Sequence, residues 1–597
     1  MPESNVVVSQ ITIKVSGSEV SADVMDHLIS VEVDQHSHLP HMFTIHLYDP
    51  ELDFLGSGPF DLTKEVEIIG EAVDGSTFQM IKGEITALEP EFASGAVAEL
   101  VIRGYDKAHR LFRETKSKSF LNIKDSDLAS QMAGGAGLSA QVDATSTVYD
   151  HLYQDNQTDL AFLMQRAWRI GYECFVQEGK LYFRKPPSSG SGPTLKWGEN
   201  LIAFSPRVTL AEQVDEVLVK GWDVSKQEVI VGQAQKGTLY PKIGESKDGA
   251  RWASTFGTGK VIIVDQPVVS QAEADILAKA RLDELSGVFV EAEGSAYRQP
   301  DVTAGKMVTL EGLGTRLDGT YLVTQAHHRY DQKGYKVDFS VRGLRTGQLT
   351  EQFAQADPVQ RWPGVVTAVV TNTDDPSDWG RVKVKYPWMS DDAESFWARV
   401  IGIGAGPEAG YYVMPEVGDE VLVAFEYGEI NHPIVLGGVW NGQFAIPPEA
   451  AGAAQGEKPL VRTWHSRTGH YMAMYDNADN KVEIITAGGH SATLDDANQK
   501  VEVITTGGHT VTIDDQGKSI TITSSGGHEV KLDDNGRKII ITSAGDVEVK
   551  STTNMKIEAG ANLELKATGN LDIKANGLTN IQTSAIMNIK GSLINLN

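Results

Sequence analysis

Cysteine is almost absent from this chain of 597 residues, because Cys174 is the only one. No disulfide can therefore form within the chain. Cys174 lies in an apolar run, which favours a buried structural thiol over a nucleophile. The chain also lacks an apolar run long enough to cross a membrane. In Met1–Gly17, apolar and polar residues alternate as in a strand, whereas a signal peptide has a charged segment followed by an apolar one. We expect synthesis and folding in the cytoplasm, and any export would use a route other than general secretion.

Positive charge is also scarce. The 53 lysine and arginine residues face 80 aspartate and glutamate residues, so the formal net charge is −27. Three copies together would carry 3 × −27 = −81. A body with this charge repels nucleic acid at long range, so no nucleic acid partner is expected. Glycine is abundant at 59 residues, which is typical of a β protein rich in turns.

Residues that could carry catalysis or bind a metal do not form a recognisable set. No Ser/His/Asp triad or pair of carboxylates falls in a plausible pocket. Two groups of histidines stand out, namely His36, His38 and His41 near a strand start, and His490, His509 and His528 at a 19-residue interval. The first group lacks a carboxylate or cysteine at ligand spacing. The second could hold an ion around a common axis, but a turn or packing role is favoured. We predict no catalytic residue, no cofactor and no metal site.

The first 355 residues read as two β units separated by a small α/β segment. Strand-like alternation over 1–120 gives way to helical spacing in Asp125–Gly137 and Thr158–Gly171. We assign 121–200 to this α/β insert. Alternation returns in 201–355, where a helix is expected at Gln271–Leu285.

Residues 356–445 form a compact block in which residues typical of turns separate the expected strands. Five short strands in such a block predict a small closed barrel of the OB-fold type. The expected strands are Pro363–Thr371, Arg381–Pro387, Phe396–Ile403, Glu420–Phe425 and Pro433–Trp440. A linker, 446–467, follows.

Residues 468–545 repeat with a period of 19. Equivalent positions are Asp476, Asp495, Asp514 and Asp533, then Val482, Val501, Ile520 and Ile539, then Gly488-Gly-His490, Gly507-Gly-His509 and Gly526-Gly-His528. Each unit reads as two strands joined by a turn, such as Asp514-Asp-Gln-Gly517. A fixed short period predicts a stacked β architecture rather than a globular core.

The last segment, 546–597, repeats every eight residues. Two apolar residues separated by one position recur in five of the six octads, the other octad has Thr579 and Ile581, and small residues between the pairs allow the chain to turn. The apolar positions are Val547, Val549, Met555, Ile557, Leu563, Leu565, Leu571, Ile573, Ile581, Met587 and Ile589. One such strip has nothing to pack against, so we predict that these residues form the core of three chains wound together. The expected structure is an intertwined, trimeric β-helix, or triangular β-prism.

Several stretches resemble the VgrG-type spikes of contractile injection systems. The OB block carries the clearest of them in Gly380–Trp388, Phe396–Val400, Met414–Glu426 and Asn431–Asn441, and the first half adds Arg103–Arg113 and Gln154–Leu163. The resemblance covers almost the whole chain, and the order of hub, OB barrel and β-prism is more specific than any one motif. His36–Ile45 and the chain length resemble most the extracellular, phage-tail-like members.

The resemblance implies a mainly β homotrimer with two hub β-barrels per chain, so that three chains match a sixfold tube. The implied function is structural: the trimer caps the inner tube, contacts baseplate proteins, and punctures the target envelope when the sheath contracts. It implies transient contact with the target membrane and cargo effectors as further partners. The particle would assemble from cytoplasmic protein and be released extracellularly in some members.

The end of the chain departs from family members that close their tip with a metal-binding His-x-His motif. No histidine follows His528, and the octad register is lost near the last residues. Exposed Leu593, Ile594 and Leu596 would form a blunt threefold platform, which suggests docking of a separate PAAR-like tip protein. The alternative is that this end frays.

Two other functions remain open on the sequence. A β-helical tailspike polysaccharide depolymerase would need acidic pairs in a groove, and eight-residue faces leave no room for one. A receptor-binding fibre would need an aromatic-rich distal end, whereas no aromatic residue follows Tyr475. The absence of an inserted catalytic domain is the main argument against an enzyme.

The octad register makes a direct prediction. Leu571→Asp would place a charge in the shared apolar core and disrupt the distal prism, because a buried, unpaired charge is strongly unfavourable. Limited proteolysis and sedimentation of the variant measure this. A trimer that stays protease-resistant would contradict the assigned register.

Overall fold

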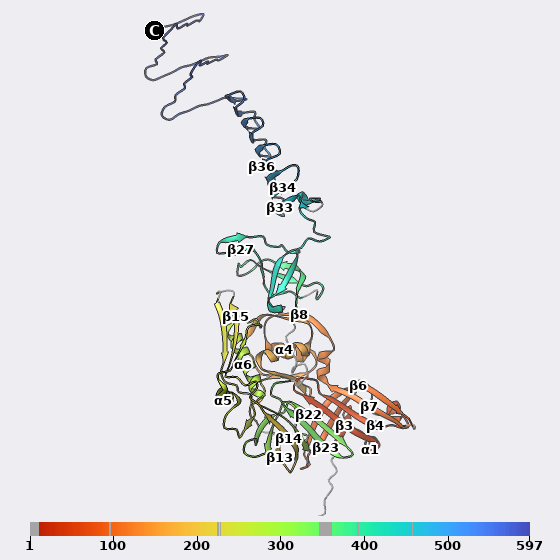
Figure 1. The fold of residues 1–597 in the computed structure, drawn as a ribbon. Helices are drawn as coiled ribbons and strands as arrows, with labels where there is room; N and C mark the ends of the chain where they lie inside the picture. Colours follow the sequence, from red (N-terminus) through yellow and green to blue (C-terminus); the bar gives the residue numbers. More distant parts are fainter. Residues whose placement is uncertain are drawn as a thin grey trace, which may run out of the picture. The chain divides into compact units, whose positions relative to one another are not determined.

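The computed structural model describes residues 11–94, 97–190, 192–223, 226, 228–345, 361–390, 393–455 and 458–596 (Figure 1). The chain divides into two compact units, Met1–Trp440 and Asn441–Asn597. Mainly β structure is present in both, as the sequence predicts. None of the described helices has the length and apolar character needed to cross a membrane.

An eleven-stranded sheet forms the largest part of the first unit. Its order is β14 (Leu201–Val208), β19 (Val290–Tyr297), β23 (Gly334–Val341), β22 (Gln325–Asp331), β3 (Leu28–His36), β4 (Met42–Tyr48), β7 (Val97–Asp106), β6 (Thr77–Ala93), β5 (Glu65–Glu71), β1 (Ile11–Val15) and β2 (Ser18–Glu19). β22 pairs antiparallel with β3, with His328 opposite Val33. The two expected hub barrels are therefore joined through one continuous sheet, because pairing β3 with β22 satisfies the backbone edge that each strand would otherwise expose.

Smaller sheets complete the second half of the hub. One contains β13 (Thr194–Lys196), β20 (Met307–Glu311), β21 (Gly319–Leu322) and β17 (Lys242–Ile243), and another contains β16 (Glu228–Ala234), β15 (Glu216–Asp223) and β18 (Lys260–Ile263). Helix α6 (Gln271–Gly287) packs on β15 and β16. The helix begins where the Ser270 side chain accepts a hydrogen bond from the Glu273 backbone N–H, and this confirms the helix expected from the sequence. Short helices are α1 (Ala22–Asp26), α2 (Asp53–Ser57), α5 (Gly249–Ala253), η1 (Lys107–Phe112) and η2 (Ser254–Phe256).

The α/β insert has its own core. It comprises the pair β8 (Thr115–Lys124) and β10 (Val148–Thr158), helices α3 (Asp125–Gly135) and α4 (Asp159–Ile170), and the sheet of β11 (Glu173–Gln177), β12 (Lys180–Arg184) and β9 (Ser139–Val142). Helix α4 is capped by Thr158 and ends at Gly171 with φ 70°, as the sequence pattern indicates. Cys174 lies in this core, and burial raises the pKa of its thiol to about 12. This placement confirms that the thiol is buried.

The OB barrel is closed and has the expected five strands. They are β24 (Val365–Asn372), β25 (Arg381–Lys385), β26 (Ala398–Val400), β30 (Pro433–Gly438) and β29 (Glu420–Phe425). A hairpin of β27 (Ile403–Gly406) and β28 (Ala409–Tyr411) and the turn η3 (Glu426–Gly428) complete the block. In the loop before β25, Asp375 accepts two hydrogen bonds from the guanidinium of Arg381, which holds the pKa of this carboxyl below its ordinary value.

Buried charges connect the insert, the hub and the barrel. Arg169 of α4 lies 2.9 Å from a carboxylate oxygen of Glu273 on α6 and 3.7 Å from one of Glu429 at the barrel. The same guanidinium donates to the carbonyl of Pro267. On the barrel side, the Asn431 amide oxygen accepts a hydrogen bond of 2.8 Å from the backbone N–H of Tyr153. These bonds fix the barrel to the hub, because a buried charge that loses its partner costs several kcal/mol.

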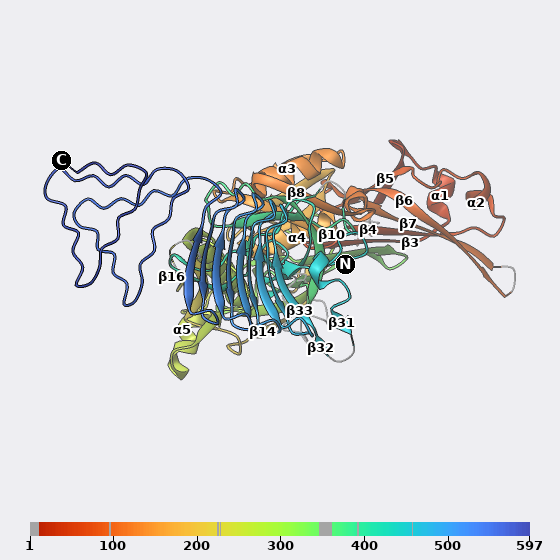
Figure 2. The same cartoon turned by 90° about the horizontal axis from the view of Figure 1, so that it is seen from above.

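The second unit is built around a nine-stranded antiparallel sheet in simple chain order. Its strands are β33 (Val461–His465), β34 (Tyr471–Tyr475), β35 (Lys481–Ile485), β36 (Ser491–Asp495), β37 (Lys500–Ile504), β38 (Thr510–Asp514), β39 (Ser519–Thr523), β40 (Glu529–Asp533) and β41 (Lys538–Thr542). The strands follow one another in a row (Figure 2). Each 19-residue repeat is two strands and two turns, as predicted. A short pair, β31 (Ala454–Gln455) and β32 (Lys458–Pro459), and the turn η4 (Pro448–Ala450) precede the sheet, and no strand is assigned in the described residues beyond Thr542.

Buried histidines make the stability of the first unit depend on pH. Burial lowers the pKa of His41 and His151 to about 4 and that of His328 to about 3, whereas the ordinary value is about 6.5. Between these values the unfolded chain binds protons that the folded chain does not. The stabilisation is therefore complete above about pH 6.5 and is lost as the pH falls through about 4.

We predict that His328→Gln lowers the dependence of unfolding free energy on pH by about 1.4 kcal/mol per pH unit between about pH 4 and 6, because one titrating group is removed. Urea unfolding across this range measures the slope. Tyr335→Phe is the control, since it removes the phenol 2.7 Å from the His328 ring but leaves the histidine. An unchanged slope in His328→Gln would contradict the assignment.

Candidate functional site

The nine-stranded sheet carries apolar side chains on one face. In β38, for example, the second and fourth residues, Val511 and Ile513, share this face. Because the strands pair in register, equivalent residues line up in two columns across the sheet. One column contains Met474, Val482, Leu494, Val501, Ile513, Ile520, Leu532 and Ile539, and the other Met472, Ile484, Ala492, Val503, Val511, Ile522, Val530 and Ile541. We call these columns the apolar ladders.

Within one chain the ladders have no apolar layer opposite them. Ile520 is 37% exposed and Leu494 is 53% exposed, and the exposed fraction reaches 71% at Ile539 on the last strand. Soluble monomers rarely expose a contiguous apolar patch larger than a few hundred Å². The ladders therefore form a surface suited to packing against protein.

The opposite face of the sheet is mostly polar, although Ile485, Ile504 and Ile540 also lie on it. Its edge column contains Lys481, Asp495, Lys500, Asp514, Ser519, Asp533 and Lys538, so that oppositely charged residues face one another across several strand pairs. Lys500 also lies 3.3 Å from Glu502 on the same strand. Such pairs suit a solvated face, and the contrast between the two faces fixes the orientation of the sheet.

Two kinds of turn hold the strands in register. At the Gly-Gly-His turns, Gly508 adopts φ +82° and its N–H donates to the carbonyl of Thr505, while the Thr505 hydroxyl accepts from the N–H of His509. The His509 ring then accepts from the N–H of Ser525 in the following turn. His490 makes the same bond to Thr506. These histidines therefore connect successive turns along one edge of the sheet.

At the other edge, aspartate side chains close the turns. Asp514 accepts from the N–H of Gly517 at 2.6 Å, and Asp533 accepts from that of Gly536 at 2.9 Å. A residue with positive φ precedes the next strand each time, as at Lys518 and Arg537. This geometry is that of a tight hairpin loop, and it agrees with the turn chemistry inferred from the sequence.

The octad residues lie beyond this sheet. Val547, Val549, Met555, Ile557, Leu563, Leu565, Leu571, Ile573, Ile581, Met587 and Ile589 are all exposed, from 45% at Met587 to 72% at Ile581. Leu593, Ile594 and Leu596 near the end are exposed as well. One chain thus leaves all of these side chains without an apolar partner, and the trimeric prism stays a prediction.

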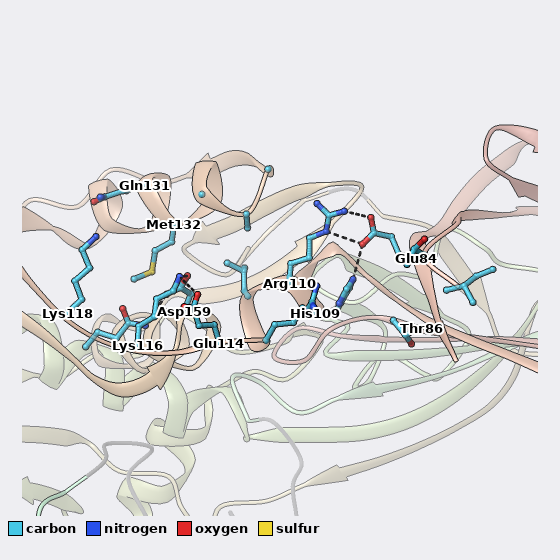
Figure 3. A pocket seen from close by; sticks show the side chains of 18 of the residues that line it. Glu84, Thr86, His109, Arg110, Glu114, Lys116, Lys118, Gln131, Met132 and Asp159 are labelled. Carbon is cyan, nitrogen blue, oxygen red and sulfur yellow. Dashed lines mark hydrogen bonds and ion pairs between the residues drawn. The ribbon is translucent and has the colours of Figure 1, made fainter. Parts of the chain in front are cut away.

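An open groove of about 1310 Å³ lies in the first unit, lined by residues of η1, β8 and α3 among others (Figure 3). Its carboxylates are engaged: Glu84 contacts His109 and Arg110, and Lys116 lies 2.7 Å from Asp159 and 3.5 Å from Glu114. Burial alone would raise the pKa of Glu84, but its hydrogen bonds to Arg110 and His109 lower it overall. Among these lining residues, each acid contacts a base, with Lys116 shared by Asp159 and Glu114, which suits an ion-pair network rather than a general base.

Sequence reasoning found only part of the apolar face. The 19-residue interval identified Val482, Val501, Ile520 and Ile539, which belong to one ladder. The second ladder was missed, although an apolar residue two positions from each of these, such as Ile522, signals it. Cross-strand register is what turns the separate pairs into two continuous columns.

Comparisons with known proteins find relatives for parts of this chain. Residues 5–332 match the Alg8 N-terminal domain, and residues 366–440 match the type VI secretion system/phage-baseplate injector OB domain. Among curated proteins, the type VI secretion system spike protein VgrG1c of Pseudomonas aeruginosa is 32% identical over 57% of this chain and 50% of its own length. VgrG1b of the same species is 28% identical over 65% of this chain and 55% of its own length.

The chain thus spans about half the length of the curated relatives it matches. Among solved structures, the E. coli c3393 protein, a component of the type VI secretion system, aligns over 72% of this chain and 99% of its own, with 13% identity and a TM-score of 0.46.

The turn geometry predicts different effects at neighbouring glycines. Gly508→Ala should destabilise the sheet by about 1–2 kcal/mol, because a left-handed backbone disfavours a Cβ and the new methyl group would lie 3.3 Å from the Cβ of Ser525. Gly507→Ala is the control, since its backbone is not left-handed and the nearest atom is 3.6 Å away. Equal unfolding midpoints in urea for the two variants would contradict this account.

Proposed function

We propose that this chain, which belongs to the family of the Alg8 N-terminal domain and is homologous to VgrG spike proteins, is the central spike and baseplate hub of a contractile injection system. Three copies would cap the inner tube with their first units and form the puncturing spike with their second units. The apolar ladders are the main structural support for this proposal, because they form a continuous apolar surface that remains exposed in a single chain.

The apolar ladders of one chain would pack against the same ladders of two further copies. Burying a large apolar side chain contributes about 1.5–3 kcal/mol, and both ladders run almost the full length of the nine-stranded sheet. Identical ladders meeting around a threefold axis would exclude water from a common interior. A closed threefold arrangement also avoids the open-ended assembly that a non-closing contact would produce.

The octad segment continues the same pattern. Five of the six octads supply two apolar residues at positions i and i+2, as in Val547 and Val549, and so do the strands β34 to β41 of the sheet, as in Ile520 and Ile522. An apolar stripe two residues wide thus runs from the sheet into the octads. This continuity supports a shared interior for both zones of the trimer, with a triangular β-prism at its distal end.

The proposed partners follow from this role. The hub end would contact the inner tube and baseplate proteins, and the exposed Leu593, Ile594 and Leu596 suit a PAAR-like tip protein. Cargo effectors and the target membrane would be transient partners, and nucleic acid would not be one. The chain would assemble into the particle in the cytoplasm, with extracellular release in phage-tail-like systems.

The proposed role requires no catalysis by this chain. The curated relatives are named as spike proteins, and the groove of the first unit holds paired charges. The work of penetration would come from contraction of the sheath, while the trimer supplies stiffness. A tailspike depolymerase or a receptor-binding fibre would instead require a glycan-cleaving or receptor-binding face.

Two substitutions on adjacent residues test the trimer. Ile520→Asp places a charge on an apolar ladder, and it should shift the full-length chain from trimer to monomer in sedimentation velocity, since the charge would be buried without a partner. Thr521→Asp, on the opposite face of the same strand, is the matched control and should stay trimeric. A monomeric wild type, or a trimer that tolerates Ile520→Asp, would refute the proposal.

A further inference from the structure

Three potential metal ligands lie together on neighbouring strands of the hub sheet. They are His46 of β4, Glu99 of β7 and Glu91 of β6. Glu91 lies directly opposite Glu99, and Glu99 lies opposite Tyr48, two residues from His46 on the same face of β4. Backbone pairing therefore holds all three side chains on one side of the sheet.

The ligand atoms of these residues are close enough to share one ion. Each residue offers a nitrogen or carboxylate oxygen, and these atoms all lie within 4.8 Å of one another. The Nε2 atom of His46 lies 2.7 Å from an oxygen of Glu99. That nitrogen is nevertheless out of contact with solvent and has no hydrogen-bond partner of suitable alignment. A buried polar atom that forms no hydrogen bond requires a physical explanation.

The charges of the residues around this nitrogen also favour a bound cation. Carboxylates that face each other directly across two strands repel, and Glu91 and Glu99 are such a pair. Among the described residues, neither forms an ion pair with a lysine or arginine, although Glu89, two residues from Glu91 on β6, is 3.0 Å from Arg103. A cation at the centre of the cluster would neutralise the two carboxylates and accept the lone pair of His46.

We propose that His46, Glu91 and Glu99 bind one divalent first-row transition metal ion, with Zn²⁺ as the representative. One imidazole and two carboxylates form a ligand set that Zn²⁺ accepts, with water in the fourth position. Ca²⁺ and Mg²⁺ fit less well, because they prefer sites made of oxygen ligands. In this reading Nε2 of His46 is unprotonated and is the metal ligand.

The position of the site suggests what the ion does. The last residue of β4, Tyr48, pairs with Glu99, whereas β6 and β7 continue to the pair Ala93 and Val97. The sheet therefore narrows at this site from three strands to a two-stranded ribbon, and β4, β7 and β6 run side by side there (Figure 2). Isolated two-stranded ribbons are marginally stable. An ion held by all three strands would fix the base of the ribbon to the sheet.

Zinc binding to the full-length protein tests the proposal. After dialysis against EDTA, isothermal titration with Zn²⁺ should give one high-affinity ion per chain, and Zn²⁺ should raise the unfolding temperature. Glu91→Gln removes one ligand at an exposed position and should weaken the affinity at least about tenfold. Glu89→Gln is the matched control on the same strand and should bind as the wild type does.

Two results would overturn the proposal. One is a wild type that takes up no stoichiometric Zn²⁺, which would leave His46 and Glu99 in contact with each other and without a metal ion. The other is equal affinity in Glu91→Gln and the wild type, which would place any bound zinc elsewhere. If Glu91→Gln fails to fold, His46→Gln supplies the same comparison. Sedimentation of these variants reports separately on the trimer, so failure of the metal site is distinguishable from failure of the proposed function.

Discussion

The uncovered apolar face of the nine-stranded sheet is the constraint from which the rest of the second unit follows. A single antiparallel layer can keep one face in water only when its other face is packed on a core. Here the other face carries two continuous ladders of aliphatic side chains with no layer opposite them in the same chain. Hydrogen bonds at the turns hold the strands in register, but they cannot remove this apolar area from water. In the proposed trimer, the same faces of the other two chains would supply the missing layer.

The first unit solves the same problem internally. Its hub halves, its insert and its OB barrel each contain a cluster of buried aliphatic and aromatic residues. Buried ions then connect the clusters, as Arg169 connects the insert to Glu273 and Glu429. The first unit thus buries its apolar residues within one chain, whereas the second unit leaves most of its apolar residues exposed in one chain. This division suits a hub that must keep its shape and a shaft that exists only as an assembly.

Local sequence patterns predicted the elements well, because the forces that set them are local. Thr158 and Gly171 lie at the two ends of α4 and cap the helix. The strands of the OB barrel lie between residues that are typical of turns. Pairings between distant strands were not predictable. Nothing near β3 in the sequence indicates that β22, almost 300 residues away, completes its edge.

The metal cluster illustrates the same limit. Whether Glu91 faces Glu99 depends on an irregularity of β6 between Ile85 and Ala87, which shifts its register against β7. A shift of one residue moves every side chain beyond it to the other face of the sheet. Spacing in the sequence therefore could not place Glu91 beside His46, and the absence of a metal site stays a prediction.

Both the 19-residue repeats and the octads keep the apolar stripe. They differ in which strands supply the hydrogen bonds to the backbone groups at each strand edge. In the sheet, each strand pairs with its neighbours in the same chain, and a full hairpin of 19 residues is needed for two strands. In the octads, pairing within one chain is absent from the described residues beyond Thr542, yet the apolar pair recurs every eight residues. In the proposed trimer, eight residues would suffice because the neighbouring strands would come from the other chains. The shorter period thus marks the point at which hydrogen bonding, as well as apolar packing, would pass from one chain to the assembly, and closing every edge in this way would give the distal end its stiffness.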